Sequence, residues 1–128
     1  MAKPSCTATT LAVSFEELRR AALDVKPVSG LTHRFYRYPA RFSPTFAATV
    51  IAQFSKPGDL ILDPQMGGAT AIVEGMRLGR RAVGCDLNSL AVFVARVKTT
   101  LVSTPERAAL QRWADEVVPS LLYSHTPA

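Results

Sequence analysis

The chain has 128 residues, of which 48% are hydrophobic and 20% are charged, with a formal net charge of +5. This length argues against more than one domain, and no run of about 20 apolar residues could span a membrane. Two cysteines are too few for a disulfide scaffold, and the first residues lack the apolar block of a signal peptide. We therefore expect a cytoplasmic protein whose basic charge suits an anionic partner such as nucleic acid, or only maintains solubility.

The first part of the chain contains two predicted helices separated by an irregular segment. Residues 1–13 are rich in Thr, Ala and Ser and are expected to be loosely attached. Ser14 can cap a short helix over residues 15–23, and prolines and glycines break the segment 24–42. Ser43, followed by a proline, then starts another helix, in which one face carries Phe46, Val50, Ile51 and Phe54.

The middle of the chain alternates short apolar strands with a helix. We predict strands at residues 60–63 and 82–86. The second is apolar throughout, so it is expected to be buried on both faces, with Cys85 inside it. Residues 70–78 form the connecting helix, which Gly79 closes.

Two further helices are predicted after the second strand. Asn88 or Ser89 caps the first of them, and its buried face is predicted to consist of Leu90, Phe93, Val94, Val97 and Leu101. The last helix opens at Thr104 and ends at Pro119. Trp113 is expected to anchor that helix in the core, beside Leu110 and Val117.

These elements predict an α/β protein with a partial Rossmann-like methyltransferase fold, in which helices flank a short parallel sheet. We divide the chain into an N-terminal extension with a short helix (1–29), a cofactor-binding βαβ core (30–103), and a C-terminal helix and tail (104–128). Two parallel strands with exposed edges rarely form a stable sheet alone. We therefore expect a second copy, a separate subunit or further chain to lie against them.

Two acidic residues, Asp63 and Asp86, stand at the carboxyl ends of the predicted strands, where a βαβ unit can hold an adenosyl cofactor. A pyrophosphate at the first turn would need bare N–H groups and no negative charge nearby. Here Asp63 adds a charge and Pro64 removes an N–H, whereas S-adenosylmethionine has no phosphate and carries an ammonium and a sulfonium. The pattern favours an S-adenosylmethionine site. In the simpler alternative both aspartates, like Gly67 and Gly68, only serve the turns.

Several motifs resemble those of site-specific DNA amino-methyltransferases, which methylate N6 of adenine or N4 of cytosine. The similarity extends over about residues 30–101 and is carried by His33-Arg34-Phe35-Tyr36-Arg37-Tyr38-Pro39-Ala40-Arg41-Phe42-Ser43-Pro44, Pro57-Gly58-Asp59-Leu60-Ile61-Leu62-Asp63-Pro64, Met66-Gly67-Gly68-Ala69-Thr70 and Gly84-Cys85-Asp86-Leu87-Asn88. The resemblance implies S-adenosylmethionine as the methyl donor, DNA as a partner, and direct attack of the base amine on the donor methyl.

The resemblance also implies roles for individual residues. Asp63 would contact the methionine end of the donor, which Gly67 and Gly68 would let the backbone approach. Asp86 would accept hydrogen bonds from the ribose hydroxyls, and Leu87 would cover one face of the adenine. The further residues implied at the donor site are Tyr38, Pro39, Ala40, Phe42, Ser43, Pro64, Gln65, Asn88 and Thr70, the last of which would also cap the connecting helix.

Two positions and one missing motif depart from the family pattern. Gln65 stands where an apolar residue is usual, and Ala69 stands where the family has a glycine, which is acceptable only if its φ is negative. The sequence contains no Asp/Asn/Ser-Pro-Pro-aromatic loop, which would hold the target amine and stack on the flipped base. We therefore expect no catalytic residue in this chain, and a second chain or a missing segment would supply the loop.

Other readings of the sequence remain open. Three arginines alternate with aromatic residues: Arg34, Arg37 and Arg41. They would contact DNA, or alternatively their aliphatic stems would lie over the edge of the sheet. Neither histidine has a partner at metal-ligand spacing, so no metal site is expected. The alternative function is a non-catalytic split subunit or remnant that binds a partner chain. A nucleotide-dependent oxidoreductase fits less well, because the third glycine of its fingerprint is missing.

Overall fold

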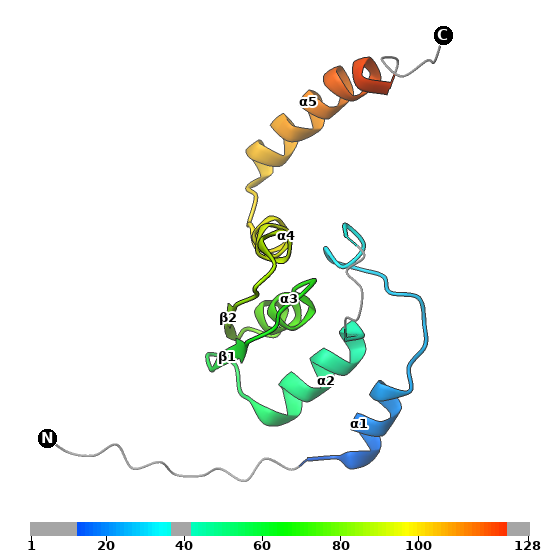
Figure 1. Ribbon diagram of the computed structural model, residues 1–128, viewed down its shortest axis with the longest axis vertical. Helices are drawn as coiled ribbons and strands as arrows, with labels where there is room; N and C mark the ends of the chain where they lie inside the picture. The colour runs from blue at the N-terminus through cyan, green and yellow to red at the C-terminus, as the bar shows by residue number, and fades with distance from the viewer. Residues whose placement is uncertain (1–12, 37–41, 123–128) are drawn as a thin grey trace, which may run out of the picture.

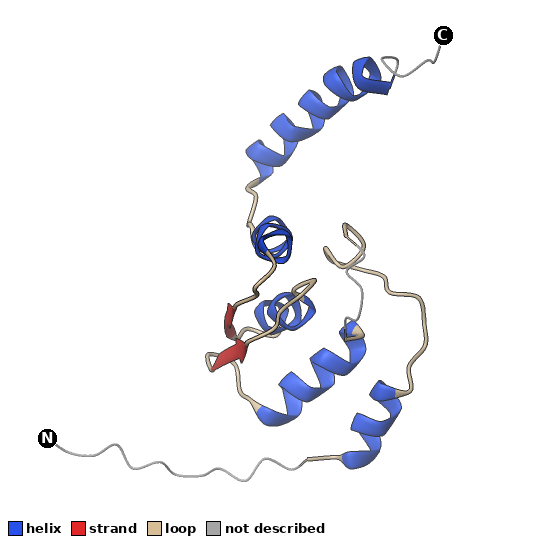
Figure 2. Cartoon of the chain, in the orientation of Figure 1, coloured by secondary structure: helices blue, strands red, loops and turns tan. Residues whose placement is uncertain are grey.

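The computed structural model describes residues 13–36 and 42–122 (Figure 1). Its elements are α1 (Phe15–Ala22), α2 (Pro44–Phe54), β1 (Leu60–Asp63), α3 (Thr70–Arg77), β2 (Arg81–Gly84), α4 (Ser89–Thr99) and α5 (Thr104–Leu122). The two strands pair in parallel, so the described chain has the predicted α/β composition, with a short sheet among helices (Figure 2). Within the described ranges, no helix combines the length and the apolar character that crossing a membrane requires.

β1, α3 and β2 form the central strand–helix–strand unit. β1 has the predicted bounds, and its pairing with β2 runs from Leu60 opposite Arg81 to Asp63 opposite Gly84. β2 ends at Gly84 rather than at residue 86. Cys85 therefore lies beyond the strand and is exposed, so the prediction that it is buried is wrong.

The two faces of the sheet have different environments. Ile61 is half-buried under α3, which approaches closely because a Cβ at Gly75 would stand only 3.2 Å from Ile61 Cδ1. On the other face, Leu60, Leu62 and Val83 are 59%, 66% and 51% exposed. Among the described elements α3 is the one helix that contacts the sheet. The predicted burial of the second strand on both faces is thus wrong for this part of the chain.

The core lies between α3, α4 and the loop that joins β1 to α3. α2 and α4 pack against α3, and α1 packs against α2 (Figure 1). Arg80 ties the turn after α3 to the end of α2, because its guanidinium donates to the hydroxyl and the carbonyl of Ser55 at 3.0 and 2.7 Å. The main buried cluster is Met66, Ala69, Ile72 and Ala95. Since Met66 and Ala69 belong to the β1–α3 loop, the core supports that loop directly.

Three predicted helix starts are confirmed. The side chains of Ser14, Ser43 and Asn88 accept hydrogen bonds from first-turn amides of α1, α2 and α4. The prediction that Thr70 caps α3 is wrong, because Thr70 is already the first helical residue. Ala69 precedes it without a side-chain cap.

The last two helices bury less than predicted. The buried residues of α4 are Ala91, Val94, Ala95 and Lys98. Of the five positions predicted to be buried there, only Val94 is. α5 contacts no other described helix or strand and leads away from them (Figure 1). Trp113 is accordingly 56% exposed rather than a core anchor, and Pro119 lies inside α5 instead of ending it.

Candidate functional site

A small cavity lies at the carboxyl end of β1, where the chain turns into α3. Its volume is about 50 Å³, and its walls are Phe42, Asp63, Gln65, Met66, Gly67, Gly68, Thr70 and Ala71. Six of these were predicted from the sequence, and they come from two separate segments of the chain, Phe42 and residues 63–70. A larger hollow of about 440 Å³ between α1 and α2 contains none of the residues predicted for the site. The small cavity is therefore the candidate site, despite its size.

Asp63 serves the turn and also lines the cavity. Its Oδ1 accepts a hydrogen bond of 3.2 Å from the backbone N–H of Gln65, which fixes the first turn after β1. An ionised carboxylate can accept about four hydrogen bonds, so this contact leaves acceptor capacity. Asp63 is half-buried and is followed by Pro64, which has no N–H to offer. The turn and the cavity thus share one negative side chain.

Asp86 joins the loops that follow the two strands. Its Oδ1 accepts from the N–H of Asn88 at 2.8 Å, and its Oδ2 accepts from the N–H of Gly67 at 2.9 Å. These two N–H groups hold the pKa of the Asp86 carboxyl below its ordinary value, because they stabilise the ionised form. Backbone bonds close the same junction, since Cys85 donates to Asp63 and Met66 donates to Cys85. The two acidic strand ends are therefore parts of one connected structure.

The loop between Asp63 and α3 has an unusual backbone. Gly67 has a φ of 46° and Ala69 a φ of 60°, both in the left-handed region. An alanine at position 69 was expected to fit only with a negative φ, but Ala69 occupies this position with a positive one. Ala69 donates to the Met66 carbonyl at 2.7 Å in a tight turn that leads directly into α3. The turn geometry, not the preference of alanine, decides the conformation.

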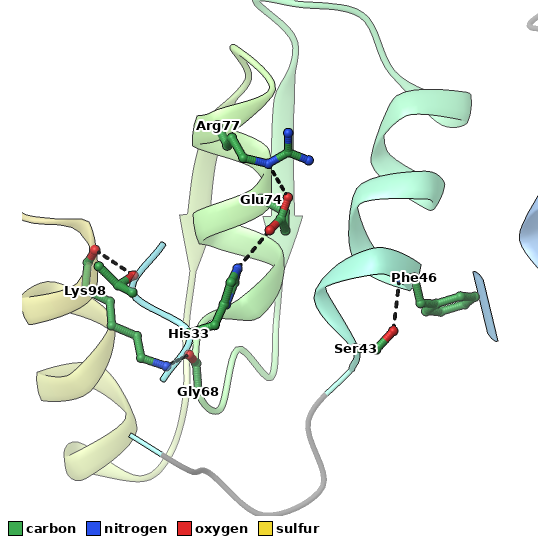
Figure 3. Close-up of polar contacts among 8 residues, drawn as sticks. His33, Ser43, Phe46, Gly68, Glu74, Arg77 and Lys98 are labelled. Carbon is green, nitrogen blue, oxygen red and sulfur yellow. Dashed lines mark hydrogen bonds and ion pairs between the residues drawn. The ribbon is translucent and has the colours of Figure 1, made fainter. Parts of the chain in front are cut away.

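Buried polar contacts that the sequence did not reveal surround this loop (Figure 3). Lys98 Nζ, from the last turn of α4, donates to the Gly68 carbonyl at 2.8 Å. His33 Nε2 lies 2.8 Å from Glu74 Oε1, with both side chains buried, and Arg77 Nε donates to the other Glu74 oxygen at 2.6 Å. The pairing of Glu74 with Arg77 follows from helical spacing. His33 and Glu74 are 41 positions apart, and no local pattern joins them.

The remaining predicted site residues have varied surroundings. Arg37, Tyr38, Pro39, Ala40 and Arg41 lie outside the described residues. Arg34 is exposed, and the Leu87 side chain is fully exposed. Ser43 and Asn88 use their side chains to cap α2 and α4. Among the described residues, no group of three His, Cys, Asp or Glu could hold a metal ion.

Comparison with known proteins places the described motifs in a family. A family model described as DNA methylase matches residues 16–95, which include the cavity and both acidic strand ends. No solved structure matches the chain.

Three curated relatives are named type II methyltransferases. M.MvaI of Kocuria varians is 40% identical over 73 residues, which are 55% of this chain and 16% of the relative. M.MjaII of Methanocaldococcus jannaschii is 30% identical over 66 residues, 52% of this chain and 12% of the relative. M1.MboII of Moraxella bovis is 42% identical over 40 residues, 31% of this chain and 15% of the relative. The chain spans less than a sixth of each relative, and it belongs to the N6/N4 family of DNA methylases.

Proposed function

We propose that this chain forms the S-adenosylmethionine-binding part of a DNA methyltransferase acting on the exocyclic amine of adenine or cytosine. One observation carries the proposal: the Asp63 carboxylate lines the same cavity as Gly67 and Gly68. On this proposal residues 30–103 form a partial Rossmann-like core, with residues 1–29 as an extension before it and 104–128 as a helix and tail after it. The names of the relatives support methyl transfer as the chemistry, and the description of the family model supports DNA as the substrate.

Electrostatics supports this donor over a phosphorylated cofactor. A carboxylate attracts the ammonium and sulfonium of S-adenosylmethionine and repels a pyrophosphate at the same place. The N–H of Gly67, which a phosphate would need, is already bonded to Asp86. The site therefore has a negative charge, and the N–H groups of Gln65 and Gly67 are already hydrogen-bonded. A phosphate-binding loop has free N–H groups and no negative charge.

The size of the cavity limits what it can hold. At about 50 Å³ it is far below the roughly 300–1,000 Å³ of ordinary ligand sites, so it would take only part of the donor. We assign it the methionine end, with Asp63 facing the ammonium. The ribose hydroxyls would then reach the remaining acceptor sites of Asp86, and the adenine would lie against exposed Leu87. Phe42 and Ser43, with Tyr38, Pro39, Ala40, Pro64, Gln65, Thr70 and Asn88, would complete the surroundings.

The donor supplies the methyl group, which the amine of the base would attack directly. The part played by this chain would be to hold the donor and to exclude competing ligands. The Pro-Pro-aromatic loop that holds the target amine does not occur in this sequence, so another segment or a second chain would supply it. Arg34, together with Arg37 and Arg41, would contact DNA phosphates.

Titration calorimetry of the full chain with S-adenosylmethionine and with NAD tests the proposal. We expect the methyl donor to bind more tightly than NAD. Asp63→Asn, which removes the charge and keeps the shape, is expected to weaken donor binding by roughly 10- to 100-fold, the range for a hydrogen bond to a charged group. Asp115→Asn on exposed α5 is the matched control and is expected to change nothing. Tighter binding of NAD, or equal donor affinity in parent and Asp63→Asn, would refute the proposal.

The open face of the sheet favours a second candidate, a non-catalytic subunit that binds a partner chain. Leu60, Leu62 and Val83 are each at least half exposed on a face that no described helix contacts. Neighbouring apolar side chains of this kind mark surfaces that are covered in an assembly. Size-exclusion chromatography with light scattering, with and without a candidate partner, tests whether a second chain binds. A lone monomer that methylates DNA would exclude the need for a partner.

A further inference from the structure

Lys98 puts a charged group where packing favours an apolar one. The residue is only 5% exposed, and its neighbours on the inner side of α4, Ala91, Val94 and Ala95, are buried as well. Removing an ammonium from water is costly unless polar groups receive it. A leucine or methionine would fill the space without that cost. The lysine therefore calls for a reason beyond packing.

The ammonium of Lys98 acts on the loop at the candidate site. Nζ donates to the Gly68 carbonyl at 2.8 Å, across the space between α4 and the start of α3 (Figure 3). Gly68 stands between two left-handed residues, Gly67 and Ala69. Without outside contacts, a backbone of this kind has few local interactions to keep it in one form. The hydrogen bond from Lys98 fixes the peptide between Gly68 and the left-handed Ala69.

A negative group that follows β2, at the same end of the sheet, also holds this loop. Asp86 Oδ2 accepts from the N–H of Gly67 at 2.9 Å, one residue before the carbonyl that Lys98 holds. The Lys98 ammonium thus holds the C=O of Gly68, and the Asp86 carboxylate holds the N–H of the preceding residue, Gly67. Hydrogen bonds with one charged partner are roughly twice as strong as neutral ones. The loop is therefore pinned on both sides before any ligand arrives.

Lys98 also connects the loop to residues 30–36, which precede α2 in the chain. The hydroxyl of Thr32 donates to the Lys98 backbone carbonyl at 3.2 Å. The next residue, His33, pairs with Glu74 on α3. One turn of α4 is thus in contact with the glycine loop through a side chain and with residues 30–36 through its backbone.

We propose that Lys98 is the positioning residue of the methyl-donor site, where its buried ammonium keeps the Gly68 peptide and the surrounding loop in the form that accepts the donor. The inference rests on the proposed function for the identity of the ligand. A loop that is ordered in advance loses less conformational freedom on binding, so holding it raises affinity. Lys98 does not itself touch the donor on this proposal, since its Nζ is engaged with the loop backbone.

Donor affinity tests the proposal in the full chain. Lys98→Met, which keeps the length and removes the charge, is expected to weaken S-adenosylmethionine binding about tenfold in titration calorimetry. Lys98→Arg retains charge and donors and is expected to restore affinity to within about threefold of the parent. Val94→Ala removes a buried side chain from the same face of α4 without touching the loop, and is the control for lost stability. Equal donor affinity in parent and Lys98→Met, or an equal loss in Val94→Ala, would overturn the proposal.

Amide hydrogen exchange without donor gives a second, independent readout. In Lys98→Met the amides of Gly67 and Ala69 are expected to exchange about tenfold faster, while the Arg81 amide, which donates to the Asp59 carbonyl across the sheet, stays protected. If Gly67 and Ala69 exchange at the same rate in Lys98→Met as in the parent, the positioning role of Lys98 is overturned, whichever ligand the site binds. If Lys98→Met shows faster exchange at these two amides but the parent chain binds no donor, the proposed function is refuted and the positioning role of Lys98 stands. If Lys98→Met does not fold, Lys98→Gln is measured in its place with the same two outcomes.

Discussion

Replacing Ala69 by glycine tests whether the loop at the candidate site stores backbone strain. Ala69 has a φ of 60° and is 0% exposed, so it combines an unfavourable conformation with complete burial. A left-handed conformation costs a residue with a Cβ about 1–2 kcal/mol. Glycine adopts it without this cost, and Ala69→Gly removes the strain together with one buried methyl group.

The gain and the losses in Ala69→Gly are of similar size. Losing the buried methyl costs about 0.8 kcal/mol, and the greater freedom of glycine in the unfolded chain costs roughly 0.4–1 kcal/mol. We therefore expect the free energy of unfolding to change by less than about 1 kcal/mol. Ala91, also 0% exposed but inside α4, is the matched control. Ala91→Gly has the same losses with no strain to relieve, so it is expected to cost about 2 kcal/mol.

Urea unfolding followed by circular dichroism compares the two variants with the parent. Ala69→Gly is expected to be more stable than Ala91→Gly by roughly 1–2 kcal/mol. The m value, the slope of the unfolding free energy against urea concentration, is expected to stay the same in both variants. Equal losses of stability in the two variants would refute the reasoning, because they would mean that position 69 carries no conformational cost.

Two further measurements test the polar contacts. The N–H groups of Asn88 and Gly67 lower the pKa of Asp86, so the unfolded chain, with the ordinary value of 3.8, binds this proton more readily than the folded chain. The stabilisation is therefore complete above that value and is lost as pH falls through the folded pKa. In Asp86→Asn the urea midpoint is expected to fall less steeply with decreasing pH than in the parent. An equally steep fall in both chains would contradict this. Glu74→Ala removes a buried hydrogen-bond partner of His33 and is expected to cost about 3 kcal/mol of unfolding free energy. Glu116→Ala on exposed α5 is expected to stay within about 0.5 kcal/mol of the parent, and similar effects of the two alanines would count against the buried pair.

Features that depend on neighbours in the sequence could be predicted. Ser14, Ser43 and Asn88 cap their helices because a cap needs only the amides of the following turn. β1 has its predicted bounds because Asp63 and Pro64 end an apolar run. The meeting of Asp63 with the glycine loop follows from the same short stretch of chain.

Features that depend on distant partners could not be predicted. Trp113 is apolar enough for a core, but burial also requires a surface to pack against, and the described chain offers none to α5. The bond between Lys98 and Gly68 joins residues 30 positions apart, and lysine at a helix end ordinarily indicates a solvated position. Ala69 was misjudged because the hydrogen-bonded turn into α3 outweighs the intrinsic preference of one residue.

The uncovered side of the sheet also determines how the chain behaves as its concentration rises. With Leu60, Leu62 and Val83 open to water, and no described helix against them, another apolar surface can pack on this face of the sheet. Identical molecules meeting there would self-associate, whereas the second chain or further segment proposed above would cover the same aliphatic side chains. On that proposal the two associations compete for one surface, so self-association is expected to fall when the covering polypeptide is added.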